Sequence, residues 1–134
     1  WKHYTTICPA GPTEFLARKA LLVKEKLAER SKAIIQENLK LCEAFFTRFP
    51  EHFIWRRPLA GSVAFIEVDL AKLGFDSAAA HCHHLAQNHG IVLLPGKCLG
   101  FNDTFVRLGL GRAGFGESLE AYASVIANGE SESY

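Results

Sequence analysis

The sequence predicts an α/β fold, an α+β layer sandwich in which a small mixed sheet is covered by helices and preceded by a long N-terminal bridging helix. Residues 13–49 contain no glycine or proline and carry apolar side chains at helical spacing. Strand-like runs follow near residues 62–68, 91–95 and 105–110, and two further helical stretches cover about 76–88 and 116–127. Strands that alternate with covering helices are typical of layered folds.

The composition is that of one globular domain with a real core. Of the 134 residues, 49% are apolar and 22% are charged. The formal net charge of +1 gives no overall field that would attract nucleic acid or an anionic membrane. No apolar run reaches membrane-spanning length, and the first ten residues do not form a secretory signal. We therefore expect a cytoplasmic protein that binds neither nucleic acid nor a membrane.

Cysteine and methionine usage add two expectations. Cysteines 8, 42, 82 and 98 are widely spaced without a CxxC pair, which indicates reduced thiols rather than a disulfide framework or a zinc site. The chain contains no methionine, so it lacks an initiator residue and we interpret it as a piece of a longer protein.

The long N-terminal helix is expected to begin near Pro12, because proline fits a first helical turn. Two apolar stripes, one before and one after the charged segment "KEKLAERSK", predict a bend or break near Arg30–Ser31. A long helix whose halves bury separate stripes is typical of a link between two domains. The alternative is a single bent amphipathic helix in one core.

The strand near residues 105–110 places a charge in an apolar run. Alternation puts Val106, Leu108 and Leu110 on one face and Arg107 with Gly109 on the other. The second face thus presents a guanidinium beside a glycine, which leaves room for a ligand to lie against the sheet. A solvent-facing arginine is the simpler alternative.

The "HCHH" cluster of residues 81–84 suggests metal chemistry at first sight. The cluster lies in a helix that we expect to begin at the N-cap Asp76 and to end at Gly90. His81 and His84 then share a face, but no carboxylate or second cysteine stands at ligand spacing. We interpret both histidines as polar residues on a helix face and expect no metal site.

Five segments in order carry a resemblance to a known family. They are "YTTICPAGPTEFLARKAL", "NLKLCEAFF", "RPLAGSVAF", "GIVLLPGKCLGF" and "FVRLGLGRAGFGESLEAY". Together they resemble the C-terminal (small) domain of class I/II pyridoxal-phosphate-dependent aminotransferases, of fold type I. The resemblance covers nearly the whole chain.

The resemblance implies a domain division and a cofactor. Residues 1–30 would be the end of the large domain and the interdomain helix, residues 31–128 the small domain, and residues 129–134 a polar tail. The cofactor of the whole enzyme would be pyridoxal 5'-phosphate, held on a Schiff-base lysine. No lysine of this chain has the family's Ser-x-x-Lys-like context, so we expect that lysine upstream of Trp1.

The resemblance also implies roles for individual residues. Arg107 matches the family's terminal-strand arginine, which binds the α-carboxylate of the substrate by two parallel charge-assisted hydrogen bonds. Arg112 is the rival, but it lies beyond the strand. The residues expected to border the cleft are Tyr4, Thr5, Thr6, Gly61, Ser62 and Lys97.

The implied function is that of an aminotransferase of amino acid metabolism, which passes the amino group of an amino acid to a 2-oxo acid. The whole enzyme is expected to be a homodimer, and the isolated chain to be inactive. One alternative is a lyase, synthase or cyclase of the same fold acting on an amino acid. Another is a non-catalytic interaction module that has kept this domain.

Overall fold

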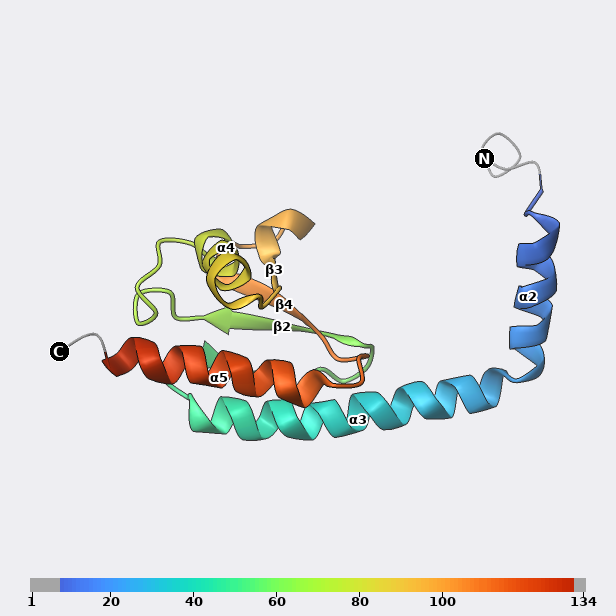
Figure 1. The fold of residues 1–134 in the computed structure, drawn as a ribbon, viewed down its shortest axis with the longest axis horizontal. Coiled ribbons are helices and arrows are strands. Elements are labelled where there is room, and N and C mark those ends of the chain that lie inside the picture. The colour runs from blue at the N-terminus through green and yellow to red at the C-terminus, as the bar shows by residue number, and fades with distance from the viewer. Residues whose placement is uncertain (1–7, 132–134) are drawn as a thin grey trace. The chain divides into compact units, whose positions relative to one another are not determined.

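The computed structural model describes residues 8–131 (Figure 1). Residues 4–6, which we expected to border the cleft, lie outside this range. The chain divides into two compact units, residues 1–33 and 34–134. Helix α2 (Gly11–Leu22) belongs to the first unit, and α3 (Lys24–Arg48) begins there and continues into the second.

The interruption of the N-terminal helix lies at Val23 rather than near Arg30–Ser31. The backbone N–H of Val23 donates to the carbonyl of Ala20 at 3.1 Å, a tight turn that ends α2. Val23 is β-branched and has a lower helix propensity than the residues around it. The charged stretch that follows consists mainly of Lys, Glu, Leu, Ala and Arg, which are strong helix formers, so α3 runs through it unbroken.

The second unit contains a sheet of four strands among its described residues, in the order β1-β2-β4-β3. The strands are β1 (Phe53–Ile54), β2 (Val63–Val68), β3 (Leu94–Pro95) and β4 (Phe105–Gly109). Every neighbouring pair is antiparallel, so our expectation of a mixed sheet was wrong on this point. The cause is the short connection between β3 and β4, which makes them antiparallel and lets β4 insert beside β2.

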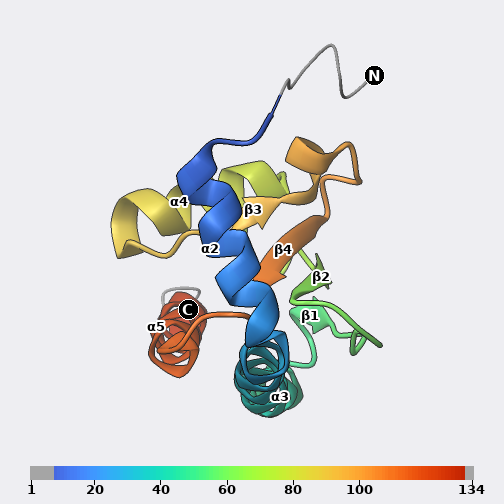
Figure 2. The same ribbon diagram turned by 90° about the vertical axis from the view of Figure 1, so that its right-hand side faces the viewer.

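Three helices cover one face of this sheet (Figure 2). They are the second half of α3, α4 (Ala78–His89) and α5 (Phe115–Ser131), and a short 3₁₀ helix, η1 (Gly96–Leu99), follows β3. Aromatic side chains fill the centre of the core, where the rings of Phe45 and Tyr122 stack at 5.6 Å. The layered α/β fold expected from the sequence is confirmed.

Helix α4 begins one residue later than expected. Ser77, rather than Asp76, is the N-cap, and its hydroxyl accepts a hydrogen bond from the Ala80 N–H at 3.0 Å. Asp103 adds a second cap from the loop before β4, because its carbonyl oxygen accepts from the Ala78 N–H at 2.8 Å. Gly90 ends the helix in the left-handed conformation, as predicted.

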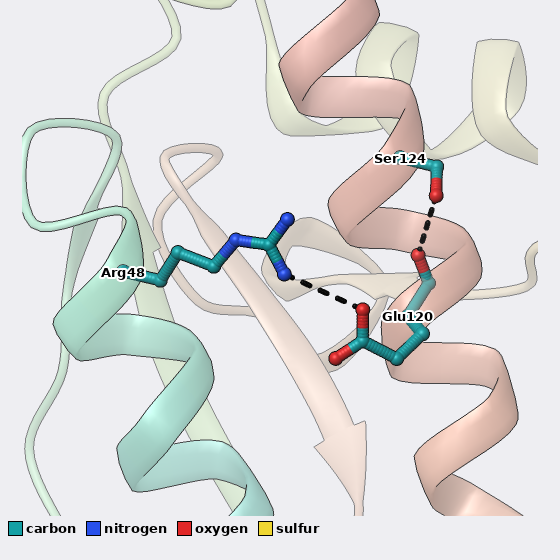
Figure 3. A network of polar contacts seen from close by, with 3 residues as sticks. All are labelled: Arg48, Glu120 and Ser124. Carbon is teal, nitrogen blue, oxygen red and sulfur yellow. Dashed lines mark hydrogen bonds and ion pairs between the residues drawn. The ribbon is translucent and has the colours of Figure 1, made fainter.

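An ion pair at the surface joins the C-terminal end of α3 to the middle of α5 (Figure 3). Arg48 Nη1 lies 3.4 Å from Glu120 Oε2, and the Ser124 hydroxyl donates to the Glu120 carbonyl at 3.0 Å. Both charged side chains are more than half exposed. In the part of the chain that the structure describes, no helix is long and apolar enough to cross a membrane.

Candidate functional site

The strand that carries Arg107 has one buried and one open side. Val106, Leu108 and Leu110 are buried, with 1%, 8% and 0% of their surface exposed. The side chain of Arg107 is exposed on the opposite face of the sheet. Within residues 34–131 no helix covers that side. We call it the open face; its members are Ile54, Val63, Phe65, Glu67, Leu94, Phe105, Arg107 and Gly109.

The sheet register places apolar side chains on both sides of Arg107. Phe65 of β2 and Leu94 of β3 are its direct partners across the strands. The rings of Phe65 and Phe101 lie 5.6 Å apart, and those of Phe101 and Phe105 lie 5.0 Å apart. Sequence reasoning missed this aromatic group. The alternation of residues 63–68 was the available signal for Phe65, whereas nothing in the sequence placed Phe101 beside it.

Arg107 is a free cation on this face. Its guanidinium forms no hydrogen bond or ion pair with any of residues 8–129. The carboxylate of the open face, Glu67, is already engaged, since its Oε2 lies 3.7 Å from Arg56 Nη1. A guanidinium that has apolar neighbours and no protein anion is suited to bind an external carboxylate through two parallel hydrogen bonds.

The other residues expected at the cleft lie at the two ends of β4. The carbonyl of Ser62 accepts a hydrogen bond from the Leu110 N–H at 2.8 Å, so Gly61 and Ser62 lie beside the exit of the strand. Lys97 lies in η1, beyond the opposite end, and its Nζ is 3.8 Å from Asp103. The structure thus places these residues around the strand of Arg107 and does not gather them at one point.

The two histidines of residues 81–84 behave differently from each other. We expected both to be polar residues on a helix face, and for His81 this was wrong. His81 is 2% exposed and its Nε2 lies 2.7 Å from the Tyr122 hydroxyl, because this turn of α4 packs against α5. His84 is half-buried, and its Nδ1 lies 2.9 Å from Asn88 Nδ2. No group of three or more His, Cys, Asp or Glu among residues 8–129 is placed to hold a metal ion.

The described residues do not fit pyridoxal phosphate by themselves. Every lysine between residues 8 and 131 is exposed, so none lies in an enclosed site where it would hold an aldehyde. The gap in the core has a volume of about 10 Å³, which leaves room for about one water molecule. Its lining is apolar and comes from residues such as Phe45, Ile66 and Tyr122. The open face therefore presents an exposed guanidinium, and the described residues form no cofactor cradle beside it.

Comparison with known structures identifies the fold. The chain superposes on a pyridoxal-phosphate-dependent aminotransferase from Streptococcus suis 89-1591 with a TM-score of 0.80 and 26% identity, over 96% of this chain and 32% of that one. A pyridoxal-phosphate-dependent cyclase, OrfR, matches with a TM-score of 0.80 and 20% identity, over 95% of this chain and 34% of that one. The N-succinyldiaminopimelate aminotransferase from Mycobacterium tuberculosis matches with a TM-score of 0.71 and 15% identity, over 93% and 33%.

These matches show that the chain has an aminotransferase-like fold, similar to the C-terminal part of pyridoxal-phosphate-dependent aminotransferases. The chain spans about a third of the length of the solved structures that it matches. No protein-family model matches the sequence, and no curated protein matches it either. The predicted resemblance to the C-terminal domain of these aminotransferases is confirmed at the level of structure.

Proposed function

We propose that this chain is the substrate-binding part of a pyridoxal-phosphate-dependent aminotransferase, an enzyme that transfers an amino group from an amino acid to a 2-oxo acid. Arg107 is proposed to bind the α-carboxylate of both substrates. The observation that carries the proposal is a guanidinium with no partner among residues 8–129, at the centre of an open, largely apolar sheet face, in a fold whose solved relatives include aminotransferases.

The surroundings of Arg107 support this role physically. Phe65 and Leu94 flank it and offer no competing anion. Their apolar surface lowers the local dielectric once a substrate covers it, which strengthens the attraction between guanidinium and carboxylate. A carboxylate held at both oxygens fixes the orientation of the rest of the amino acid. Such positioning lowers the activation free energy of a reaction by several kcal/mol.

The proposal includes the parts of the enzyme outside the described residues. Pyridoxal phosphate would supply the electron sink of the reaction. The lysine that holds it is proposed to lie upstream of Trp1, so this chain alone does not transaminate. Residues 1–30 would be the end of the large domain and the interdomain helix, residues 31–128 the small domain and residues 129–134 a tail. The whole enzyme is proposed to be a cytoplasmic homodimer.

Steady-state kinetics of the whole enzyme test the role of Arg107. Arg107→Ala should raise KM for the amino acid and for the 2-oxo acid together, because both use the same carboxylate contact. Arg107→Lys should recover part of the loss, since lysine keeps the charge without the planar pair of donors. Arg112→Ala is the matched control and should leave both KM values near those of the wild type. Unchanged kinetics for Arg107→Ala would remove Arg107 from the site.

A second candidate function is supported by the match to a cyclase. A lyase, synthase or cyclase also needs its amino acid held by the carboxylate, so Arg107 fits either chemistry. Product analysis separates them. Release of a 2-oxo acid with amination of an acceptor supports transfer, whereas a product that retains the amino group, formed without an acceptor, supports the alternative.

A parent chain without a cofactor-bearing lysine would instead support a non-catalytic interaction module.

A further inference from the structure

Asn38 is a polar residue on the buried, otherwise apolar face of α3. Its surface is 5% exposed, and it lies beside the core residues Leu39 and Cys42. Its Nδ2 donates two hydrogen bonds across the structure, to the carbonyl of Leu110 at 2.9 Å and to that of Arg112 at 2.8 Å. The amide nitrogen carries two hydrogens, and both are used.

The two acceptor carbonyls lie where β4 leaves the sheet. The strand ends at Gly109, and the Leu110 N–H donates to the Ser62 carbonyl as the last bond toward β2. After that bond, the carbonyls of Leu110 and Arg112 need donors from outside the sheet, because an unpaired buried carbonyl is costly. The side chain of Asn38, on α3, is the donor to both. It therefore fastens the exit of β4 to α3.

We propose that Asn38 is a positioning residue for Arg107, a role that rests on the proposed carboxylate contact of Arg107. Leu110 follows Arg107 by three residues, or about 10 Å along the strand. On the open face the intervening position is Gly109, which has no side chain to pack and meets nothing within 4 Å even with a Cβ added. The two hydrogen bonds of Asn38 thus hold the exit of β4 against α3, in addition to the pairing of β4 with β2.

Substitution of Asn38 in the whole enzyme tests the proposal. Asn38→Asp keeps the shape of the side chain but replaces the Nδ2 amino group, which donates both hydrogen bonds, with a carboxylate oxygen that faces the two carbonyl oxygens. We expect KM for the amino acid to rise about tenfold, because small displacements of a positioning group have large kinetic effects. Asn38→Ser, which keeps one donor, should give an intermediate KM and serves if the aspartate variant does not fold.

The control is a core substitution far from the exit of β4. Ile126→Val in α5 removes one buried methyl group and should lower stability with KM unchanged. A second readout is hydrogen exchange of the amides of residues 105–110, which should be faster in Asn38→Asp and unchanged in Ile126→Val. Equal KM increases in the two variants, or unchanged exchange in Asn38→Asp, would overturn the positioning role.

The outcomes also separate this inference from the proposed function. If Arg107→Ala raises KM and Asn38→Asp does not, the positioning role alone is wrong. If Arg107→Ala leaves KM unchanged, the carboxylate contact is wrong and the positioning role falls with it, whatever the exchange data show.

Discussion

His81 Nε2 lies 2.7 Å from the hydroxyl of Tyr122, and this buried contact joins α4 to α5. Both residues are almost fully buried, and the ring of Phe75 lies 4.8 Å from that of His81. Burial, with a smaller contribution from nearby His84, lowers the pKa of His81 from 6.5 to about 4. Burial also raises the pKa of Tyr122. The folded protein therefore holds a neutral imidazole against a neutral phenol.

Stability should fall as the pH is lowered from 6.5 toward 4. In this window the unfolded chain protonates His81 and the folded chain does not, so the unfolded state binds more protons and gains stability. At one pKa unit per 1.36 kcal/mol, the full loss is about 3 kcal/mol. Urea unfolding at a series of pH values between 7 and 4 measures it.

The control for this pH dependence is a pair of variants on the same helix. His81→Gln should flatten the slope between pH 6.5 and 4, whereas His83→Gln, at an exposed position, should keep the wild-type slope. Carboxylates contribute equally to the pH dependence of stability in all three proteins, so the difference in slope between wild type and His81→Gln is due to His81. Identical slopes in wild type and His81→Gln would show that the imidazole does not titrate as its burial requires.

Removal of the Tyr122 hydroxyl should destabilise the fold. Tyr122→Phe keeps the ring in the aromatic core but leaves His81 Nε2 buried without its partner. His81 Nδ1 already has no hydrogen-bond partner among the described residues, so the imidazole would lose its remaining hydrogen bond. The expected cost is about 1–3 kcal/mol in the free energy of unfolding.

A double-mutant cycle checks the origin of that cost. In a His81→Leu background, Tyr122→Phe should cost clearly less than in wild type, because no imidazole nitrogen is left unpaired. An additive result would mean that the hydroxyl stabilises the core through some other contact.

Local pattern predicted much of this fold. The alternation of residues 105–110 correctly separated the buried Val106 and Leu108 from the exposed Arg107, and the strand at 63–68 and the helix that ends at Gly90 lie where they were expected. These features depend on neighbours within a few residues. β1 has only two residues, which is too short for an alternating pattern to be visible in the sequence. The strand expected at residues 91–95 is also shorter than predicted, since only Leu94 and Pro95 pair with a neighbouring strand.

Contacts between distant residues were beyond the sequence. His81 is buried in contact with Tyr122, which is 41 positions away in the sequence. Asn38 donates its hydrogen bonds to carbonyls more than 70 positions away. Neither residue differs locally from a polar residue on a helix surface. Arg107 became a candidate because it is a charge in an apolar strand and because it matches the resemblance to a known family, whereas the aromatic group beside it depends on the pairing of β2 with β4.

The ion pair between Arg48 and Glu120 should contribute little. Its two side chains are 54% and 76% exposed, so water and salt screen the attraction (Figure 3). Glu120→Gln should lower the free energy of unfolding by less than about 1 kcal/mol. Chemical denaturation at low and at 1 M salt measures the loss, and a larger or strongly salt-dependent value would contradict this expectation.

Two glycines near β4 should respond in opposite ways to alanine. A Cβ on Gly96 would lie 2.6 Å from the carbonyl oxygen of Asn102 and 3.1 Å from Phe105 Cβ, so the backbone of this loop would have to move. A Cβ on Gly109 would meet nothing within 4 Å. Gly96→Ala should therefore cost about 1–3 kcal/mol, as overpacking does. Gly109→Ala should change stability by less than about 0.5 kcal/mol.

Thermal and urea unfolding of the two variants side by side give the comparison. Both change one hydrogen to a methyl group in the same sheet region, so differences in unfolded-state entropy cancel. A Gly96→Ala protein as stable as Gly109→Ala would mean that the turn between β3 and β4 is looser than its contacts indicate. A large loss for Gly109→Ala would mean that the open face beside Arg107 is already covered, and that a methyl group there displaces what covers it.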